Sequence, residues 1–229
     1  MKHVSIVVPV LNEAQGLEQA LRALRPLRGG GHEVIVVDGG STDGSARLAA
    51  PLADRVLSAE RGRANQMNAG AQAAGGDVLL FLHADTRLPE RAAQIVLDEL
   101  ARTRRVWGRF DVRIDGRHRL LRLVAVLMNL RSRLTGICTG DQAIFVLRDV
   151  FLERGGFPAI ALMEDIALSR NLRRVSPPLR VATPVHTSAR RWERGGVVRT
   201  IVLMWWLRLR YFVGASPVRL ARIYDGRNT

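Results

Sequence analysis

The sequence has very little cysteine and lysine, and no long apolar run without charge. Cys138 is the only cysteine among the 229 residues, which excludes an intrachain disulfide and fits a reducing cytoplasm. We expect it to pack in the core, as free cysteines commonly do. The apolar run at 201–207 is enclosed by arginines and is shorter than the roughly 18 residues of a membrane-spanning helix.

The start of the chain also lacks the features of a secretory signal. The apolar run within residues 1–13 is short, and polar residues follow it at once. We therefore expect a cytoplasmic protein that is soluble or lies on the inner face of the cell membrane.

Almost all of the positive charge is arginine, because Lys2 is the only lysine. The net charge of +14 and the isoelectric point near 11.6 have two interpretations. One is a mutational preference for arginine codons. The other is an anionic partner, either nucleotide phosphates, a membrane surface or nucleic acid. Charge alone leaves these open.

Hydrophobic residues make up 47% of the chain, which is enough for a substantial core. Short apolar runs alternate with helical patterns through the first hundred residues. The expected strands are 4–8, 34–37, 55–57 and 78–82, and the expected helices are 13–27, a short one ending at 50, 63–74 and one from 89 to 101. This order predicts βαβ units and a mostly parallel sheet flanked by helices, an α/β fold.

The pattern changes after about residue 105. We expect strands at 106–114 and 143–147, and helices at 118–134, 164–174 and 197–213. We interpret 1–229 as a single domain, in which 1–104 binds the donor and 105–229 forms the acceptor side.

Ligands of such sheets bind beyond the carboxyl ends of the strands, so the residues that follow each strand are the candidates. Asp38 ends the second strand, before two glycines that allow close approach of a ligand. It could accept hydrogen bonds from a base or ribose. The alternative is an ordinary turn in which Ser41 or Thr42 caps the next helix.

His83 and Asp85 follow the fourth strand. A carboxylate at the end of a buried strand needs a partner, and Mg²⁺ or Mn²⁺ bridging a diphosphate uses one or two such groups. We predict Asp85 as a metal ligand, with His83 as a second ligand or a neighbour that orients one. The alternative is that Asp85 caps the helix beginning near Pro89.

Two further segments carry polar groups of the right kind. The turn and helix start at 61–68 suit phosphate binding or form a solvated basic turn; the candidates are Arg61, Arg63, Gln66 and Asn68. Glu164 and Asp165 begin a helix whose dipole could stabilise them, or Asp165 acts as a general base. Asp141 and Gln142 could bind the acceptor or the donor sugar.

The order of these segments resembles the family 2 glycosyltransferases, which have the GT-A fold. The matching segments are VSIVVPVLNE (4–13), VIVVDGGSTDGS (34–45), GRANQMNAGA (62–71), LLFLHADT (79–86), GDQAIF (140–145), GGFP (155–158), MED (163–165) and ARRW (189–192). The HADT and GDQ segments and the short length resemble the subgroup encoded beside radical-SAM or selenium-related genes.

The resemblance implies a nucleotide diphosphate-sugar donor, a divalent metal and inversion at the anomeric carbon by direct displacement. A UDP-sugar is favoured and a GDP-sugar is the alternative. Asp38 matches the nucleotide-contacting Asp, Asp85 the last acid of the metal-binding Asp-x-Asp, and Asp165 the catalytic base. Pro9, Asn12 and Glu13 join the donor site. Arg191 and Trp192 match an Arg-Trp pair near the diphosphate and acceptor.

Three positions depart from the family pattern. Gly39 stands where many relatives have a second Asp, His83 replaces the first Asp of Asp-x-Asp, and Ser188 stands where a Gln is usual. Because His83 replaces the first Asp, the chain could instead be a catalytically inactive relative that binds the sugar, although Asp85 and Asp165 are retained.

Aromatic residues and arginines occur together at 197–213, which fits contact with a membrane surface and a lipid-linked acceptor. A core helix with arginines at its exposed ends is the alternative. A basic nucleic-acid-binding protein is the rival class, but no such motif is present and we expect no nucleic acid partner.

Overall fold

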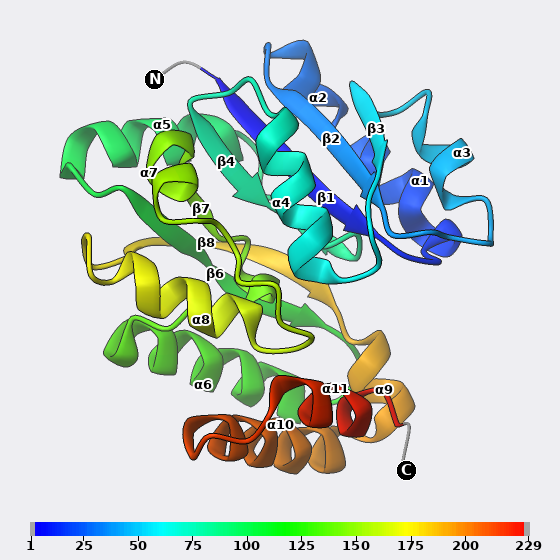
Figure 1. Ribbon diagram of the computed structural model, residues 1–229, viewed down its shortest axis with the longest axis vertical. Coiled ribbons are helices and arrows are strands. Elements are labelled where there is room, and N and C mark those ends of the chain that lie inside the picture. Colours follow the sequence, from blue (N-terminus) through cyan, green and yellow to red (C-terminus); the bar gives the residue numbers. More distant parts are fainter. Residues whose placement is uncertain (1–2, 227–229) are drawn as a thin grey trace.

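The computed structural model describes residues 3–226, which form one eight-stranded sheet covered by helices on both faces (Figure 1). The sheet order is β3-β2-β1-β4-β7-β6-β8-β5. The strands are β1 (Val4–Val10), β2 (Glu33–Asp38), β3 (Arg55–Ser58), β4 (Val78–Phe81), β5 (Thr86–Arg87), β6 (Trp107–Asp115), β7 (Phe145–Leu147) and β8 (Leu179–Ser188).

The first half of the sheet is parallel, as predicted. β1 pairs in parallel with both β2 and β4, and β2 pairs in parallel with β3. β7 is antiparallel to both β4 and β6, whereas β8 runs parallel to β6. Strands from both parts of the chain thus belong to one mixed sheet, and the boundary at residue 104 stays a prediction.

Helices cover both faces because the strands are apolar on both sides. α1 (Ala14–Ala23), α3 (Ser45–Ala49) and α5 (Ala92–Thr103) pack on one face together with Ile6 and Val8. α4 (Arg63–Ala73), α7 (Arg148–Glu153) and α8 (Glu164–Leu172) pack on the other, together with Val7. Cys138 lies fully buried in this second cluster, so the prediction that it packs in the core is confirmed. Burial raises the pKa of its thiol to about 12.

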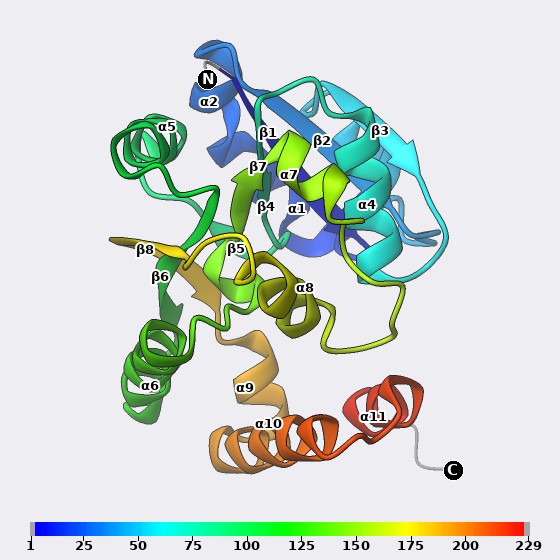
Figure 2. The same ribbon diagram turned by 60° about the vertical axis from the view of Figure 1, so that its left-hand side comes forward.

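Four further helices gather at one end of the molecule (Figures 1 and 2). They are α6 (Leu120–Thr135), α9 (Arg190–Gly195), α10 (Val197–Phe212) and α11 (Pro217–Tyr224). One apolar cluster joins α6 to the start of α10 through Val124 and Val197. Another joins α10 and α11 to the start of α8 through Leu207, Leu220 and Ile166. The C-terminal helices therefore pack directly against the segment that carries Glu164 and Asp165.

Several predicted boundaries are wrong for identifiable reasons. β1 continues through Pro9 to Val10 instead of ending there. The helix expected at 13–27 divides into α1 and α2 (Arg25–Gly29), and Gln15 and Gly16 near its start have non-helical dihedral angles. α5 begins at Ala92, three residues after Pro89. β7 begins two residues later than expected because Ala143 adopts a left-handed conformation (φ 46°).

The largest omission from the predicted elements is β8. Pro184 lies inside it, and an internal proline argues against a strand because it cannot donate to the ladder. The structure accommodates this proline at a shift of register opposite Phe110 and Asp111. Beside the shift, Asp111 is hydrogen-bonded to the buried Arg109 and to Arg180, at 2.6 Å from Arg180 Nη2. Burial alone would raise the pKa of Asp111, but these two guanidinium groups lower it overall.

Gly70 permits the close approach of α4 to the sheet. A Cβ at this position would lie 2.4 Å from Val7 Cγ1 and 3.0 Å from Val37 Cγ2. We expect Gly70→Ala to lower the free energy of unfolding by about 1–3 kcal/mol, because the added methyl group overpacks this contact. Urea denaturation monitored by circular dichroism measures the change.

Gly29→Ala is the matched control, since no heavy atom lies within 4 Å of its Cβ position. Equal midpoints for the two variants would contradict the close packing of α4 on β1 and β2.

Candidate functional site

Polar side chains converge at the carboxyl edge of the parallel strands. Because β1, β2 and β4 run in the same direction, their carboxyl ends bring three predicted segments together: residues 12–13, Asp38 and residues 83–85. The start of α8 and η1 (Gly140–Gln142) complete the site from the second half of the chain.

Asp38 has one carboxylate oxygen bound and one without a partner. Its Oδ2 accepts hydrogen bonds from the backbone N–H groups of Gly40 and Ser41, both at 3.0 Å. Its Oδ1 is buried and has no hydrogen-bond partner among the described residues. A buried acceptor without a partner is costly, so Oδ1 is suited to a ligand donor such as a ribose hydroxyl or a base N–H. Asp38 thus organises the turn and retains one free acceptor.

Pro9, Asn12 and Glu13 occupy the end of β1 and the loop after it. Pro9 is paired opposite Val37 in the sheet. Asn12 holds the neighbouring loop, because its Oδ1 accepts a hydrogen bond from Thr42 N at 2.9 Å. Glu13 contacts the start of α9, because its Oε2 accepts a hydrogen bond from Arg190 Nη2 at 2.7 Å.

Arg190 is a site residue that the sequence analysis missed, although it lies inside the ARRW segment. Its Nη2 is 2.7 Å from Glu13 Oε2 and 3.9 Å from Asp85 Oδ2. The hydrogen bond to Glu13 is the main cause of the raised pKa of Arg190, and the charges of Glu13 and Asp85 add to the increase. One guanidinium therefore joins the loops after β1 and β4 to the start of α9.

Gln66 and Asn68 use their amides to bind backbone. Gln66 is buried and donates from Nε2 to Val10 O (2.8 Å) and Val37 O (2.9 Å), which ties the ends of β1 and β2 together. Asn68 donates to Phe157 O at 2.8 Å and accepts from Phe157 N at 2.9 Å. In this geometry both amides hold the backbone around the site, and a direct role of Gln66 or Asn68 in donor binding stays a prediction. Arg61 lies exposed at the turn before α4.

The His83 ring contacts Asp141 and Gly140 from the second half of the chain. Its Nδ1 is 3.2 Å from Asp141 Oδ1, and its Nε2 is buried without a hydrogen-bond partner among the described residues. A Cβ added to Gly140 would lie 2.4 Å from Nε2, so the ring packs closely against this glycine. Nε2 is therefore enclosed against η1, and Nδ1 contacts Asp141.

Asp85 fits the requirements of a divalent cation that also binds a diphosphate. Its carboxylate is about one-third exposed at the end of β4. Mg²⁺ in such sites takes one or two carboxylates, phosphate oxygens and waters, so a single accessible carboxylate is a suitable protein ligand. Within residues 3–226, no three or more His, Cys, Asp or Glu side chains gather as a metal cluster. The donor's phosphates would have to complete the coordination.

Asp165 lies at the start of α8 with both oxygens held. Oδ2 accepts a hydrogen bond from Gly140 N at 3.0 Å, and Oδ1 accepts one from Ile166 N at 2.7 Å. The adjacent Glu164 is almost fully buried and lies 3.5 Å from Arg63 Nη1. Burial raises the pKa of Glu164, and the charge of Asp165 adds to the increase despite Arg63.

Arg63 is the cation nearest to this group of acids. Burial lowers the pKa of its guanidinium, but Glu164, Tyr224, Asp141 and Asp165 raise it more. The three carboxyl groups Asp141, Glu164 and Asp165 are defined here as the acid cluster. Burial also opposes ionisation of Asp141, yet His83, Arg63 and Arg208 lower its pKa overall.

Gln142 lies beneath the acid cluster and is fully buried. Its Oε1 accepts hydrogen bonds from Ser132 Oγ (2.6 Å) and Thr139 N (3.2 Å), and its Nε2 donates to Asn129 Oδ1 (3.3 Å). These bonds join η1 to α6. Gln142 is therefore engaged within the protein, and its predicted contact with a substrate stays a prediction.

The C-terminal helices bring Arg191 and Trp192 to different places. The Arg191 guanidinium stacks over the Tyr224 ring at 3.3 Å from the ring centroid, and its Nη2 donates to Tyr224 O. Trp192 packs with Leu121 and Ala189 in the apolar cluster of α6 and α9. Tyr224 itself was not anticipated from the sequence. Burial raises the pKa of its hydroxyl against the charges of Arg63 and Arg191, and the charges of Asp141 and Asp165 add to the increase, so this hydroxyl lies near the acid cluster.

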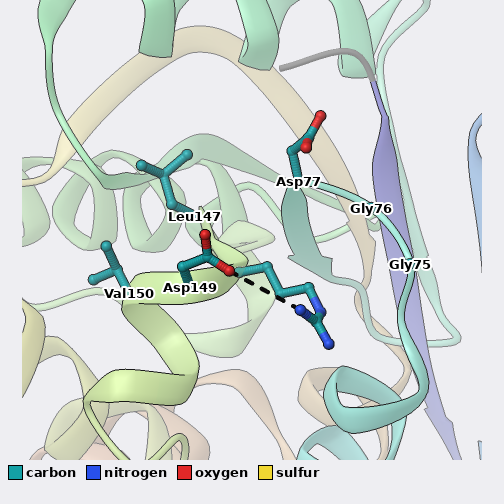
Figure 3. A pocket seen from close by; sticks show the side chains of 7 residues that line it. Gly75, Gly76, Asp77, Leu147, Asp149 and Val150 are labelled. Atoms are coloured by element: carbon teal, nitrogen blue, oxygen red, sulfur yellow. Dashed lines mark ion pairs between the residues drawn. The ribbon is translucent and has the colours of Figure 1, made fainter.

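The structure shows a cavity of about 270 Å³, but it lies elsewhere. Its walls come from residues 75–77, just before β4, and residues 147–150. Figure 3 shows Gly75, Gly76 and Asp77 opposite Leu147, Asp149 and Val150. This is the amino end of β4, whereas His83 and Asp85 follow its carboxyl end. The convergence of polar side chains, and not this cavity, marks the candidate site.

Comparison with known proteins agrees with this geometry. The family model for glycosyl transferase family 2 matches residues 5–150. A curated relative, undecaprenyl-phosphate 4-deoxy-4-formamido-L-arabinose transferase of Pectobacterium carotovorum, is 38% identical over 101 residues. The match covers 39% of this chain and 31% of the relative, so the chain spans about a third of that protein's length.

Solved structures share the fold over most of the chain. Staphylococcus aureus TarS 1–349 in complex with UDP-GlcNAc has a TM-score of 0.66 at 16% identity, and the match covers 82% of this chain and 58% of TarS. The mannosyltransferase PcManGT of Pyrobaculum calidifontis, in complex with GDP-Man and Mn²⁺, has a TM-score of 0.60 at 25% identity; this match covers 81% and 56%. The predicted GT-A fold is thus confirmed.

The raised pKa of Glu164 gives a pH-dependent prediction. Between the pKa of the unfolded chain and the higher folded value, the folded protein binds a proton that the unfolded chain lacks, so this group's contribution to stability falls as the pH rises. Glu164→Gln removes the decline. We expect the melting temperature of the variant, relative to wild type, to rise as the pH increases above about 4.5, by about 2–4 °C per kcal/mol.

Glu60→Gln is the control, because Glu60 is exposed. A difference in melting temperature between Glu164→Gln and wild type that stays constant with pH, or falls as the pH rises, would contradict the assignment of a raised pKa to Glu164.

Proposed function

The chain belongs to glycosyl transferase family 2, and from this we propose that it transfers a sugar from a nucleotide diphosphate-sugar to an acceptor hydroxyl. The observation that carries the proposal is the convergence of Asp38, Asp85 and Asp165 at one edge of the sheet, from strand ends and a helix start. Asp38 would bind the nucleoside, Asp85 the metal and Asp165 the acceptor. The placement in the radical-SAM or selenium-associated subgroup stays a prediction.

The donor would lie across the ends of β1, β2 and β4. The free Oδ1 of Asp38 suits the nucleoside, and Asp85 would hold Mg²⁺ or Mn²⁺ together with the diphosphate. When bound, the cation would neutralise the charge that develops on the leaving nucleoside diphosphate. TarS is described with UDP-GlcNAc and PcManGT with GDP-Man. A UDP-sugar is our first choice of donor and a GDP-sugar our second.

Asp165 would act as the general base. The hydrogen bonds from Gly140 N and Ile166 N hold its carboxylate in one orientation. The acceptor hydroxyl would give its proton to Asp165 as its oxygen bonds to the anomeric carbon, while the bond from that carbon to the diphosphate breaks. Displacement from the opposite side inverts the anomeric configuration. Arg63 and Glu164 would fix the position of α8 beside the donor.

The acceptor side would be the end of the molecule formed by α6 and α9 to α11. The Pectobacterium relative is named for undecaprenyl phosphate, which supports a lipid-linked acceptor. No helix within residues 3–226 has the length and hydropathy needed to cross a membrane. We propose that 197–213 contacts a membrane surface, on the inner face of the cell membrane, and that nucleic acid is not a partner.

The metal assignment predicts the behaviour of Asp85→Asn in a thermal-shift screen of UDP, GDP, CDP and dTDP with and without Mn²⁺. Ligand at 100 times its dissociation constant stabilises a protein by about 2.7 kcal/mol. We expect one nucleotide to stabilise the wild type when Mn²⁺ is present. Asp85→Asn should lose the part of this stabilisation that depends on Mn²⁺.

Asp98→Asn is the control, since Asp98 lies exposed on α5 and only Gln94 is hydrogen-bonded to it. If no nucleotide stabilises the folded wild type, the catalytically inactive sugar-binding relative becomes the better description.

The base assignment predicts that Asp165→Asn lowers turnover by about 10²–10⁴-fold. The amide oxygen of Asn can still accept the hydrogen bond from Gly140 N, so nucleotide binding in the thermal-shift assay should persist. Release of nucleoside diphosphate from the donor identified in the screen, with water as acceptor, measures turnover. An unchanged rate in Asp165→Asn would remove Asp165 from the mechanism.

A further inference from the structure

Two half-buried arginines lie near the acid cluster, on helices whose outer faces are apolar. Arg131 lies near the end of α6 and Arg208 on α10. Arg208 has no ion pair or hydrogen bond with any described residue, and Arg131 donates only one long hydrogen bond, to Ser132 Oγ at 3.4 Å. The Nε of Arg131 is buried without a partner among these residues. Most of their donor capacity is therefore unused.

The two guanidinium groups lie in the same region, because Ile137, just after α6, and Leu207 on α10 belong to one apolar cluster. Burial lowers the pKa of Arg131 to about 10, and the charge of Arg208 contributes to the decrease. Burial lowers the pKa of Arg208 as well, although Asp165 and Asp141 oppose the change. Two adjacent cations without bound anions are costly in a partly buried setting, and an anion with several oxygens would satisfy both.

The outer faces of the same two helices are exposed and apolar. On α6 the exposed side chains recur at helical spacing: Leu123, Val126, Leu127, Leu130 and Leu134. On α10 and just beyond it they are Val198, Val202, Trp205, Trp206, Leu209, Phe212 and Val213. Trp205 is 66% exposed. α6 and α10 contact each other at one end of the molecule (Figures 1 and 2), and the exposed apolar side chains of these two helices are together defined here as the apolar face.

The charges around the apolar face have one sign. α6, α10 and α11 contain no acidic residue, and their exposed basic residues are Arg119 (just before α6), Arg122, Arg133, Arg199, Arg210, Arg219 and Arg222. Arginines beside an exposed apolar surface complement anionic lipid head groups. A second copy of the chain would bring a second set of arginines against the first, so we commit to a lipid as the occupant of this face.

We propose that Arg131 and Arg208 bind the phosphate group of an amphiphilic lipid acceptor, whose apolar chain lies along the apolar face of α6 and α10. The same two helices carry both features, and the phosphate would be placed beside Asp165. This rests on the proposed function, and it adds the acceptor's chemical class and the residues that recognise its head group. The phosphate serves as a binding group, and a hydroxyl of the same acceptor remains the nucleophile.

The head-group site is tested by thermal shift with three probes: geranyl phosphate, geraniol and inorganic phosphate. We expect geranyl phosphate to stabilise the wild type more than either other probe. Arg131→Gln and Arg208→Gln should each weaken its apparent affinity by about tenfold or more, through the loss of charge-assisted hydrogen bonds. Arg102→Gln, on the exposed side of α5, is the control and should respond like wild type.

Stability without any probe separates ligand binding from a structural role. Removing one of two repelling cations should leave the melting temperature unchanged or higher. If instead the variants melt lower and still respond to geranyl phosphate, or if inorganic phosphate acts as strongly as geranyl phosphate, the proposal is overturned.

The apolar face is tested by sedimentation with phosphatidylcholine vesicles, with and without phosphatidic acid. We expect binding that requires phosphatidic acid, accompanied by a blue shift of the Trp205 and Trp206 fluorescence. Leu127→Glu and Trp205→Glu should abolish both. A dimer in solution that dissociates in Trp205→Glu, without vesicle binding, would identify the face as a self-interface and contradict the proposal.

Nucleotide binding distinguishes this inference from the proposed function. Stabilisation by nucleotide and Mn²⁺ should persist in Arg131→Gln and Arg208→Gln. Its loss in these variants would show that the arginines serve the donor and would refute the lipid site. A wild type that responds to no nucleotide would refute the proposed function instead.

Discussion

The balance of charge around the acid cluster constrains the whole architecture. Asp141, Glu164 and Asp165 lie close together, burial opposes ionisation of Asp141 and Glu164, and such carboxylates are tolerated only with cations or hydrogen-bond donors beside them. These partners come from distant parts of the chain: Arg63 begins α4 and lies 3.5 Å from Glu164, and His83 follows β4 and lies 3.2 Å from Asp141. The start of α8 and η1 must therefore lie against the half that carries the parallel strands, and the C-terminal helices pack on the start of α8. The apolar contacts of Leu207 and Leu220 with Ile166 hold them there.

Much of the fold could be predicted because the buried parallel strands are continuous apolar runs. β1, β2 and β4 are recognisable in this way, and their polarity changes abruptly at the carboxyl edge, where Asp38 and Asp85 stand. β8 could not be found by the same means. It alternates buried and exposed positions and contains Pro184, so its place beside β6 depends on a register shift that only the folded sheet reveals.

The site was predictable in part, for a related reason. Residues at strand ends are positioned by local sequence, whereas Glu13 and Arg190 meet across 177 positions of the chain. In a chain so rich in arginine, nothing local distinguishes Arg190 from the solvated ones. Sequence also cannot say whether a polar side chain faces a ligand or the protein. Gln66 binds the ends of two strands and Gln142 lies within a buried network, although their motifs suggested substrate contacts.

The place of α10 and α11 over the acid cluster has a consequence for synthesis. The ribosome releases Glu164 and Asp165 before it releases Arg208 and Tyr224. The strands of the donor half can pair while the carboxylates at the start of α8 still lack Arg208 and the Tyr224 ring, which come later in the chain. We therefore expect a nascent chain to form the sheet before it forms the complete site.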